Sequence, residues 1–263
     1  MTFKQSLPRT GHPLSRRSLR QRGGADKALY AFLEMFAIND VVHEIDDFIG
    51  DAINLDKYAV ANGGGASAAS FAINTQQGGV VRATTGTAND ATASASLITP
   101  AQWSGDKYAG VEFYWTPITA VTEARVEVGF SDVVPGSNAS VVATLATPTV
   151  NASVVDAAVD TYNHTGSTTT NQLTTIGSSI DALKSTFTPV TAVAAATKVR
   201  TRIQLVGNHV YLWRDGVLLA DHNTPGTDYI EGGSLIAVWA YVRANNATSK
   251  SLDLDAIRIW QER

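Results

Sequence analysis

The sequence predicts an all-β protein, a sandwich of two antiparallel sheets preceded by a basic arm and one short helix. Short runs of alternating apolar and polar residues recur along the chain, separated by turns rich in Gly, Asn and Asp. Two segments near the ends of this region resemble each other. No apolar run among the 263 residues reaches the about 18 residues that a membrane-spanning helix requires.

The two similar segments are residues 46–56, which begin Asp-Asp-Phe, and residues 251–260, which contain Leu-Asp-Leu-Asp-Ala. We interpret the first as an opening strand and turn, and the second as a closing strand. They bracket the β-rich region and are expected to lie together in one sheet.

The clearest hairpins lie in residues 201–222. A strand over 202–206 is followed by the turn Gly207-Asn208, a strand over 209–213, the turn Asp215-Gly216 and a strand over 217–222. An Asp-Gly pair between alternating strands favours a hairpin because glycine adopts the positive φ that the tight turn requires.

The remaining predicted strands bring the total to about twelve, which suits a two-sheet jelly roll. Along residues 107–117 one face carries Val111, Phe113 and Trp115. Along 121–130, apolar residues at 126, 128 and 130 alternate with residues 125, 127 and 129 on the other face. The other strands are expected at 71–75, 80–86, 91–98, 235–243 and 251–260.

Three parts are predicted: a flexible basic arm over 1–24, a short helix and linker over 25–45, and the sandwich over 46–263. Within the sandwich, residues 131–198 are rich in Ala, Thr, Val and Ser and are too long for a plain loop. We interpret them as added strands plus an extended loop that meets a neighbouring subunit or a shell. An ordinary internal pair of strands is the alternative.

Charge is divided unevenly along the chain. Residues 1–27 carry seven basic residues and one acidic residue, a net charge of +6, so residues 28–263 carry −10 of the total of −4. The arm is expected to bind an acidic protein surface through arginine–carboxylate pairs, or to remain solvated. Nucleic acid is the least favoured partner, since aromatic residues are absent among the arginines. The arginines concerned are Arg16, Arg17, Arg20 and Arg22.

The helix predicted after the arm is amphipathic. Leu29, Phe32, Leu33 and Phe36 follow the i, i+3, i+4, i+7 spacing of one helix face. This face is expected to pack on the sandwich or on a second copy of the chain, which would make a homo-oligomer.

Over residues 46–263 the chain resembles the concanavalin A/laminin G-like jelly roll. The resemblance lies in the opening segment 46–56, the hairpin Val-Tyr-Leu-Trp-Arg-Asp-Gly-Val-Leu-Leu-Ala over 210–220, and the closing strand over 252–260. It implies the fold and says little about function.

The whole chain also resembles head-decoration or head-fibre proteins of tailed bacteriophages, because a basic arm and brief helix precede a Thr/Ala/Val-rich sandwich without cysteine. That resemblance implies a structural virion protein on the capsid surface, assembled in the host cytoplasm. Arg16, Arg17, Arg20, Arg22, Leu29, Phe32 and Phe36 would then dock on the major capsid protein or another virion protein. The alternative is a fibre adhesin that binds a host glycan.

Carboxylates and histidines are the side chains of this sequence that could carry catalysis or bind a metal. Glu44-Ile45-Asp46-Asp47 is similar to the start of the Glu-x-Asp-x-x-Glu motif of jelly-roll glucanases, but Ile49 stands where the second glutamate belongs. The chain has neither cysteine nor a zincin-like histidine spacing. We therefore expect no enzyme, no cofactor and no metal site. Calcium at Asp46, Asp47, Asp51 or Asp56 stays an open alternative.

A sugar site would need aromatic and amide side chains at loops or strand ends. His209 and His222 could face each other across a hairpin, where a surface pair is more expected than a metal site. The candidate sugar-binding residues are Trp103, Tyr108, Tyr162, Asn163, Tyr229 and Asn245.

Overall fold

The computed structural model describes residues 41–263 with several gaps, and the text below concerns these residues only. The gaps are 51, 63–68, 75–78, 88–93, 119–123, 133–139, 145–148, 152–153, 164–170, 180–181, 191–194 and 224–227. The predicted arm and helix lie outside the described residues, and with them Arg16, Arg17, Arg20, Arg22, Leu29, Phe32 and Phe36.

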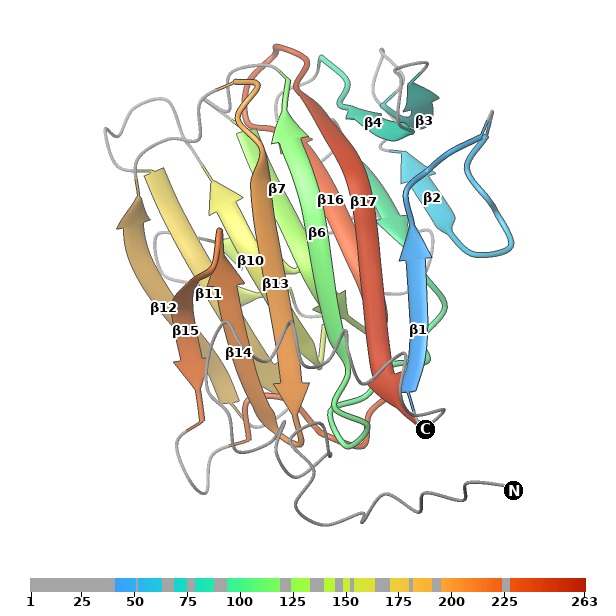
Figure 1. Cartoon of the computed structure of the whole chain (residues 1–263). Helices are drawn as coiled ribbons and strands as arrows, with labels where there is room; N and C mark the ends of the chain where they lie inside the picture. Colours follow the sequence, from blue (N-terminus) through green and yellow to red (C-terminus); the bar gives the residue numbers. More distant parts are fainter. Residues whose placement is uncertain are drawn as a thin grey trace, which may run out of the picture.

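Two antiparallel sheets stack face to face, as predicted (Figure 1). Sheet A has the order β15-β14-β13-β6-β17-β4-β3, with β1 also paired to β17. Its strands are β1 (Val41–Asp46), β3 (Ser70–Asn74), β4 (Val80–Thr84), β6 (Gly110–Pro117), β13 (Val199–Val206), β14 (His209–Arg214), β15 (Val217–His222) and β17 (Ser251–Glu262).

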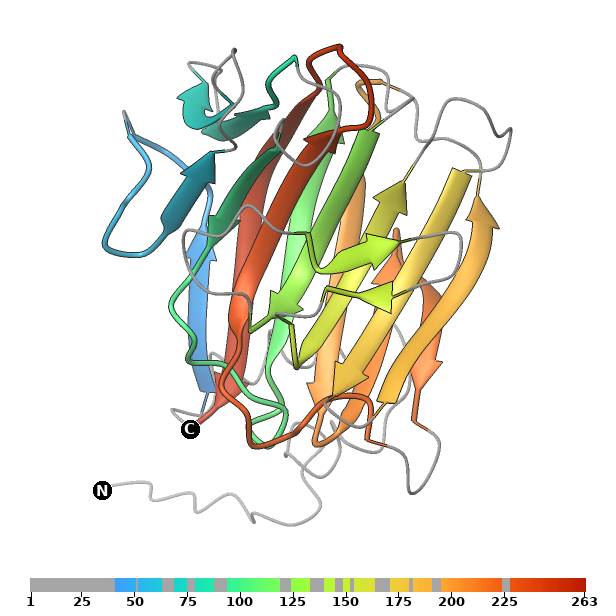
Figure 2. The same ribbon diagram turned by 180° about the vertical axis from the view of Figure 1, so that it is seen from behind.

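Sheet B has the order β12-β11-β10-β7-β16-β5-β2. Its strands are β2 (Ala59–Asn62), β5 (Ser94–Ile98), β7 (Ala124–Ser131), β10 (Ala157–Asn163), β11 (Asn171–Ser179), β12 (Ala182–Val190) and β16 (Ala237–Ala244). A separate hairpin of β8 (Val142–Thr144) and β9 (Thr149–Val150) lies across the outer side of sheet B (Figure 2).

The first and last strands lie side by side, as expected, but the first strand is Val41–Asp46 and ends where the predicted opening segment 46–56 begins. β1 pairs with β17 from Val41–Glu262 to Asp46–Ile257. The pairing therefore starts at Val41, inside the segment that the sequence suggested as a linker. Within the described residues there is no helix, and hence none long and apolar enough to cross a membrane.

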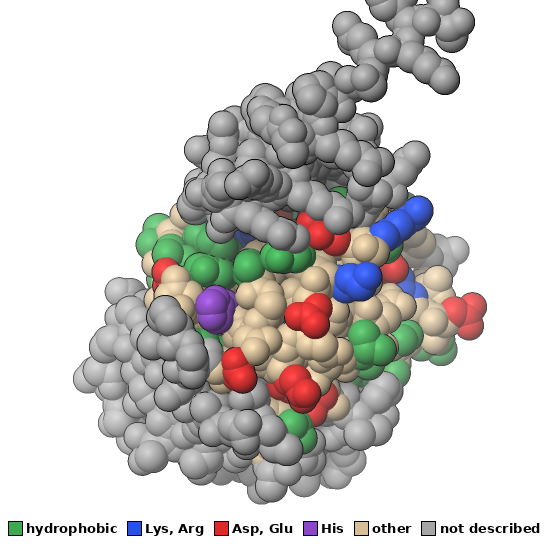
Figure 3. Space-filling view, turned by 90° about the horizontal axis from the view of Figure 1, so that it is seen from below, with side chains coloured by type: hydrophobic (Ala, Val, Ile, Leu, Met, Phe, Trp, Pro, Cys, Tyr) green, Lys and Arg blue, Asp and Glu red, His purple; other side chains and the backbone are tan. Residues whose placement is uncertain are grey.

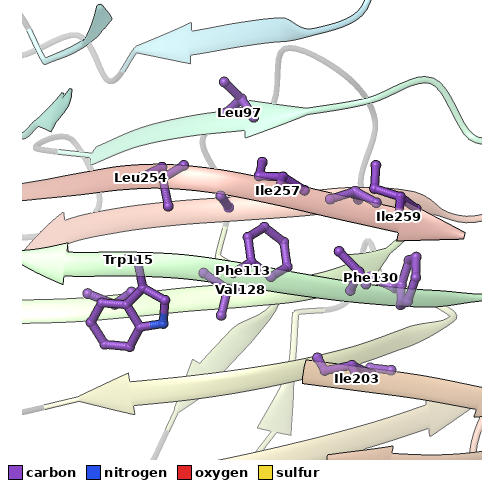
Figure 4. Packing of buried hydrophobic residues seen from close by; sticks show 14 of the residues in the cluster. Leu97, Phe113, Trp115, Val128, Phe130, Ile203, Leu254, Ile257 and Ile259 are labelled. Carbon is purple, nitrogen blue, oxygen red and sulfur yellow. The ribbon is translucent and has the colours of Figure 1, made fainter. Parts of the chain in front are cut away.

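Alternation along the strands builds the core between the sheets. Val111, Phe113 and Trp115 of β6 point inward, and so do Val128 and Phe130 of β7, as expected from their spacing (Figure 4). These side chains are at most 1% exposed. Burial of this apolar surface is the main force that holds the two sheets together.

A β-bulge divides β17 into two halves. Even-numbered side chains face the core before the bulge, and odd-numbered side chains face it afterwards. Leu252 and Leu254 point inward in the first half, and Ile257 and Ile259 point inward in the second. The register with β6 shifts between Leu254 and Ala256. One extra residue in a strand reverses which alternate positions face the core. The bulge therefore decides which side chains of the closing strand face outward.

One buried ion pair connects the two sheets through the core. Asp160 of β10 is 1% exposed, and its carboxylate accepts hydrogen bonds from Arg214 Nη2 of β14 at 2.8 Å. The Thr201 hydroxyl of β13 donates to the same carboxylate at 2.9 Å. Trp115 Nε1 donates to Thr201 Oγ1 at 3.2 Å. The pair is hydrogen-bonded on several sides, which is the condition under which a buried charge is tolerated.

The outer side of sheet B is covered by the segment that carries β8 and β9. Val141 and Val154 pack on Val159 and Trp239, forming a second apolar cluster. The carboxylate of Glu127, which the alternation places on this outer side, accepts a hydrogen bond from Val141 N at 2.7 Å. The predicted extension over 131–198 thus supplies β8 to β12; its predicted contact with a neighbouring subunit stays a prediction.

Removing one member of the buried ion pair should be strongly destabilising. Asp160→Ala leaves the Arg214 guanidinium in the core without its carboxylate, which should lower the free energy of unfolding by about 3–5 kcal/mol. Lys198→Ala breaks a pair whose lysine side chain is 81% exposed, and it should cost less than about 1 kcal/mol. Urea unfolding of both variants is the measurement. Equal losses would contradict a role of the buried pair in joining the sheets.

Candidate functional site

The outer side of sheet A carries aromatic and arginine side chains together. Their outward position follows from the inward position of their neighbours on the same strands, such as Leu212 on β14 and Ile203 on β13. We call this surface the aromatic–arginine face. Its residues are Glu112 and Tyr114 of β6, Arg200, Arg202 and Gln204 of β13, Tyr211 and Trp213 of β14, and Arg258 and Trp260 of β17.

Strand register places these side chains in rows across the sheet. Arg202 is the register partner of Trp213 on one side and of Glu112 on the other. Glu112 is in turn the partner of Arg258. The four strands β14, β13, β6 and β17 are neighbours in the sheet (Figure 1). A row of one indole, two guanidinium groups and one carboxylate therefore crosses them.

Arg202 lies between two indole rings. Its guanidinium carbon is 4.9 Å from the ring centre of Trp213 and 5.4 Å from that of Trp260. Cation–π contacts of this kind hold the guanidinium plane in place. Burial lowers the pKa of Arg202 to about 10, so the group remains charged at neutral pH.

A glycine makes room for Trp260. A Cβ built on Gly110 of β6 would lie 2.3 Å from a ring atom of Trp260, so the indole lies directly over the backbone of this residue. Trp260 Nε1 donates to Gln204 Oε1 at 3.2 Å. A larger residue at position 110 would push the ring away from the face.

Glu112 is the acceptor at the centre of the face and is 4% exposed. It accepts hydrogen bonds from Arg200 Nη2 at 2.6 Å and from the Tyr114 hydroxyl, and Arg258 Nη1 lies 3.8 Å away. Burial, followed by the hydrogen bond to Glu112, raises the pKa of Tyr114. The carboxylate raises the pKa of Arg200, mainly through its hydrogen bond. Tyr114 is half-buried and lies beneath both Arg200 and Arg258, 5.7 and 5.2 Å from its ring centre.

The sugar-binding residues proposed from the sequence do not form this face. Trp103, Tyr162 and Tyr229 are buried, at 0%, 1% and 6% exposed. The structure does not describe the side chain of Asn163. Asn245 accepts a hydrogen bond from Arg243 Nε at 3.3 Å. Tyr108, half-buried, lies on the loop before β6 with a positive φ of 54°.

The histidines and carboxylates considered in the sequence are also apart. His222 stacks on Tyr229 and pairs in register with Val210, so it does not face His209. Glu44 and Asp46 both lie near Lys57, at 3.6 and 3.4 Å. Among the residues that the structure describes, no group of three or more His, Asp or Glu side chains could hold a metal ion.

Acidic side chains gather at the end of the sandwich where β6 and β14 begin (Figure 3). Asp106 N donates to Gly232 O at 2.9 Å, and Asn208 Nδ2 donates to Asp228 Oδ1 at 2.5 Å. Glu231 N donates to Asp156 Oδ1 at 2.8 Å. These contacts tie neighbouring loops together, so we assign this end a structural role.

The aromatic–arginine face was missed in the sequence although it leaves a signal there. The outward positions of 200–204, 211–213 and 258–260 carry only arginine, glutamine and aromatic residues. Alternation alone marks them as solvent-facing. Their assembly into one face depends on strand order and on the bulge in β17, which the sequence did not reveal.

Comparison with known proteins identifies the fold. The protein of unknown function SO2946 from Shewanella oneidensis MR-1 is 13% identical, with a TM-score of 0.55 over 92% of this chain and 95% of its own. LamAcat from Zobellia galactanivorans is 12% identical, with a TM-score of 0.54 over 86% of this chain and 99% of its own. The β-glucanase of Bacillus licheniformis is 11% identical, with a TM-score of 0.52 over 84% and 98%.

No family model matches the chain, and no curated protein does. At these identities the likeness shows the fold alone: an antiparallel jelly roll of the concanavalin A-like type. Nothing in the comparisons indicates a bacteriophage virion origin.

The expectation that the chain is not an enzyme needs correction. It rested on Ile49 interrupting a glucanase-like motif in β1 and the turn after it. The structures that share the fold include a lichenase, a β-glucanase and the Crh5 transglycosylase. An interrupted motif on an edge strand is therefore no ground for excluding glycan chemistry on this fold.

His43, next to the aromatic–arginine face, should make stability depend on pH. It pairs in register with Trp260, and burial, followed by the nearby Arg258 charge, lowers its pKa from 6.5 while Glu44 opposes the shift. The unfolded chain then binds a proton more readily than the folded one. The contribution is complete above pH 6.5 and is lost as the pH falls from there to the lower folded pKa.

His43→Gln should remove this part of the pH dependence. Urea unfolding near pH 7.5 and near pH 5 should show a smaller loss on acidification for the variant than for the unaltered protein. Groups elsewhere titrate in both proteins and cancel in the comparison. An identical loss in both would contradict the assignment.

Proposed function

We propose that the protein is a carbohydrate-binding jelly roll that holds a glycan chain on the aromatic–arginine face. The observation that carries the proposal is the arrangement of Tyr114, Tyr211 and Trp260, all half-buried, beside the polar groups of Arg200 and Arg258 on one sheet surface.

Sugar rings combine apolar C–H faces with hydroxyl groups. Aromatic rings that keep one side accessible offer a surface for the C–H faces, and arginine N–H groups donate to the hydroxyls. The side chains of Arg200 and Arg258 are 43% and 42% exposed, so their donors are within reach of a ligand. The comparisons lend support, because several proteins with this fold are named for β-glucans.

Truncating the aromatic rings should weaken glycan binding while the fold is kept. Tyr211→Ala and Trp260→Ala should each reduce affinity for a bound polysaccharide about tenfold or more, the range expected when a central aromatic contact is removed. Leu235→Ala is the control, because Leu235 is 60% exposed and lies outside the face. Affinity electrophoresis against soluble plant, algal and bacterial polysaccharides is the measurement, with thermal unfolding to check the fold.

Failure of the unaltered protein to bind any polysaccharide in the panel would contradict the proposal. Binding that survives both aromatic substitutions would place the glycan on another surface.

A second candidate function is glycan hydrolysis, which the comparisons favour because several proteins with this fold are named as glucanases. Release of reducing ends from β-glucans by the unaltered protein, above the level in a control without protein, would support it. No release by the unaltered protein would count against it.

The role as a capsid decoration protein stays a prediction. It is supported by the +6 charge of residues 1–27 against the acidic remainder, and the docking residues lie outside the described part of the chain. Deletion of residues 1–24 should abolish attachment to purified particles and leave the sandwich folded. Attachment of the truncated protein would contradict the anchor.

A further inference from the structure

The aromatic–arginine face carries more positive charge than its own acidic residue neutralises. Three arginines, Arg200, Arg202 and Arg258, surround the carboxylate of Glu112, and a further carboxylate, Asp221, pairs in register with Tyr211 on the same side. Arg200 is the best satisfied of the three, because it donates to Glu112 at 2.6 Å and lies near Asp215, which accepts its backbone N–H at 2.9 Å. The surplus charge therefore resides on Arg202 and Arg258.

These two arginines also have unused hydrogen-bond donors. Among the residues that the structure describes, Nε and Nη2 of Arg202 and Nε of Arg258 have no hydrogen-bond partner, and these atoms are shielded from solvent. A buried charged donor without an acceptor is costly, and such groups usually have a partner. Arg202 as a whole is 5% exposed, so water replaces the missing acceptor poorly.

The geometry limits what that partner can be. Trp213 and Trp260 flank the guanidinium of Arg202, so a ligand has to approach the shielded edge that carries Nε and Nη2. Nε and one Nη of a guanidinium form the fork that matches the two oxygens of a carboxylate or sulfate group. Arg258 offers an entry, because its side chain is 42% exposed and its contact with Glu112 is long, at 3.8 Å.

We propose that the face selects acidic glycans, whose carboxylate or sulfate group accepts hydrogen bonds from Arg202 and Arg258 while neighbouring sugar rings lie on Trp260 and Tyr211. This inference rests on the proposed carbohydrate binding and specifies its ligand class. Glu112 accepts hydrogen bonds from Arg200 and Tyr114, which leaves Arg202 and Arg258 as the donors for the acid group.

Matched pairs of polysaccharides test the proposal. Polygalacturonate is compared with its methyl-esterified form, and dextran sulfate with dextran, at one fixed ionic strength by isothermal titration calorimetry. At least one acidic polymer should bind about tenfold or more tightly than its neutral counterpart. The pair that shows the preference identifies carboxylate or sulfate as the recognised group.

Substitutions on the face locate the effect. Arg258→Gln and Arg202→Gln should each remove most of the preference for the acidic polymer. Arg202→Lys should do the same, since lysine keeps the charge but lacks the fork. Lys198→Gln is the matched control, because it removes one positive charge from an exposed pair with Asp255 outside the face. If Arg202 variants fail to fold, Arg258→Gln still decides, because Arg258 is partly exposed.

The outcomes are separable. Equal affinity for acidic and neutral polymers would overturn the acidic preference and leave carbohydrate binding in place. No binding of any polymer would defeat the carbohydrate proposal itself. Poly-L-glutamate is the test for a peptide ligand. If it binds as tightly as the acidic polysaccharide and the same variants lose this binding, the ligand is an acidic peptide and the glycan assignment is overturned. If Lys198→Gln loses the preference for the acidic polymer as much as the Arg258 and Arg202 variants do, the preference reflects general charge attraction and the specific site is overturned.

Discussion

The two sheets depend on one buried ion pair, between Asp160 of sheet B and Arg214 of sheet A. Apolar burial alone would hold the layers together without fixing how they slide over each other, because apolar contact is not directional. The ion pair is directional, and it is bonded further to Thr201 and, through it, to Trp115. Sheet A therefore has a defined position over sheet B. Arg214 is also one residue beyond Trp213 on β14, so this pair positions the strand end that carries part of the aromatic–arginine face.

The outer sides of the two sheets differ in composition and in what covers them. On sheet B the apolar outward residues, such as Trp239 and Val159, are covered by the segment that carries β8 and β9. On sheet A the outward residues are arginines, aromatic residues and Glu112, which form cation–π contacts and ion pairs among themselves. Among the described residues, the outer side of sheet B is thus covered by the chain's own β8–β9 segment, whereas the outer side of sheet A carries arginine and aromatic side chains.

The chemistry of the aromatic–arginine face follows from crowding of like charge. Arginine side chains tolerate close packing when aromatic rings share their faces and a carboxylate shares their edges. On this face each arginine contacts an aromatic ring, but the central row contains one carboxylate, Glu112, for its two guanidinium groups. The acid group of the proposed sugar ligand would neutralise part of the arginine charge and accept hydrogen bonds from the donors that lack a partner among the described residues.

The sequence by itself determined the all-β class, the Gly207 and Asp215-Gly216 hairpin turns, and the inward side of β6 and β7. It did so because alternation and turn chemistry are local, and each is written in a few adjacent residues. The same local view put the opening strand at residue 46, although its pairing with β17 begins at Val41.

Only the tertiary structure decided where the functional surface lies. Arg202, Glu112 and Arg258 come from strands distant in sequence, and they become neighbours through strand order and register. The bulge after Leu254 turns Arg258 and Trp260 outward. The sequence also favoured Trp103 and Tyr162 as sugar-binding residues, and the fold buries them instead. Contacts between remote strands depend on the global arrangement of the sheets, which no short stretch of sequence encodes.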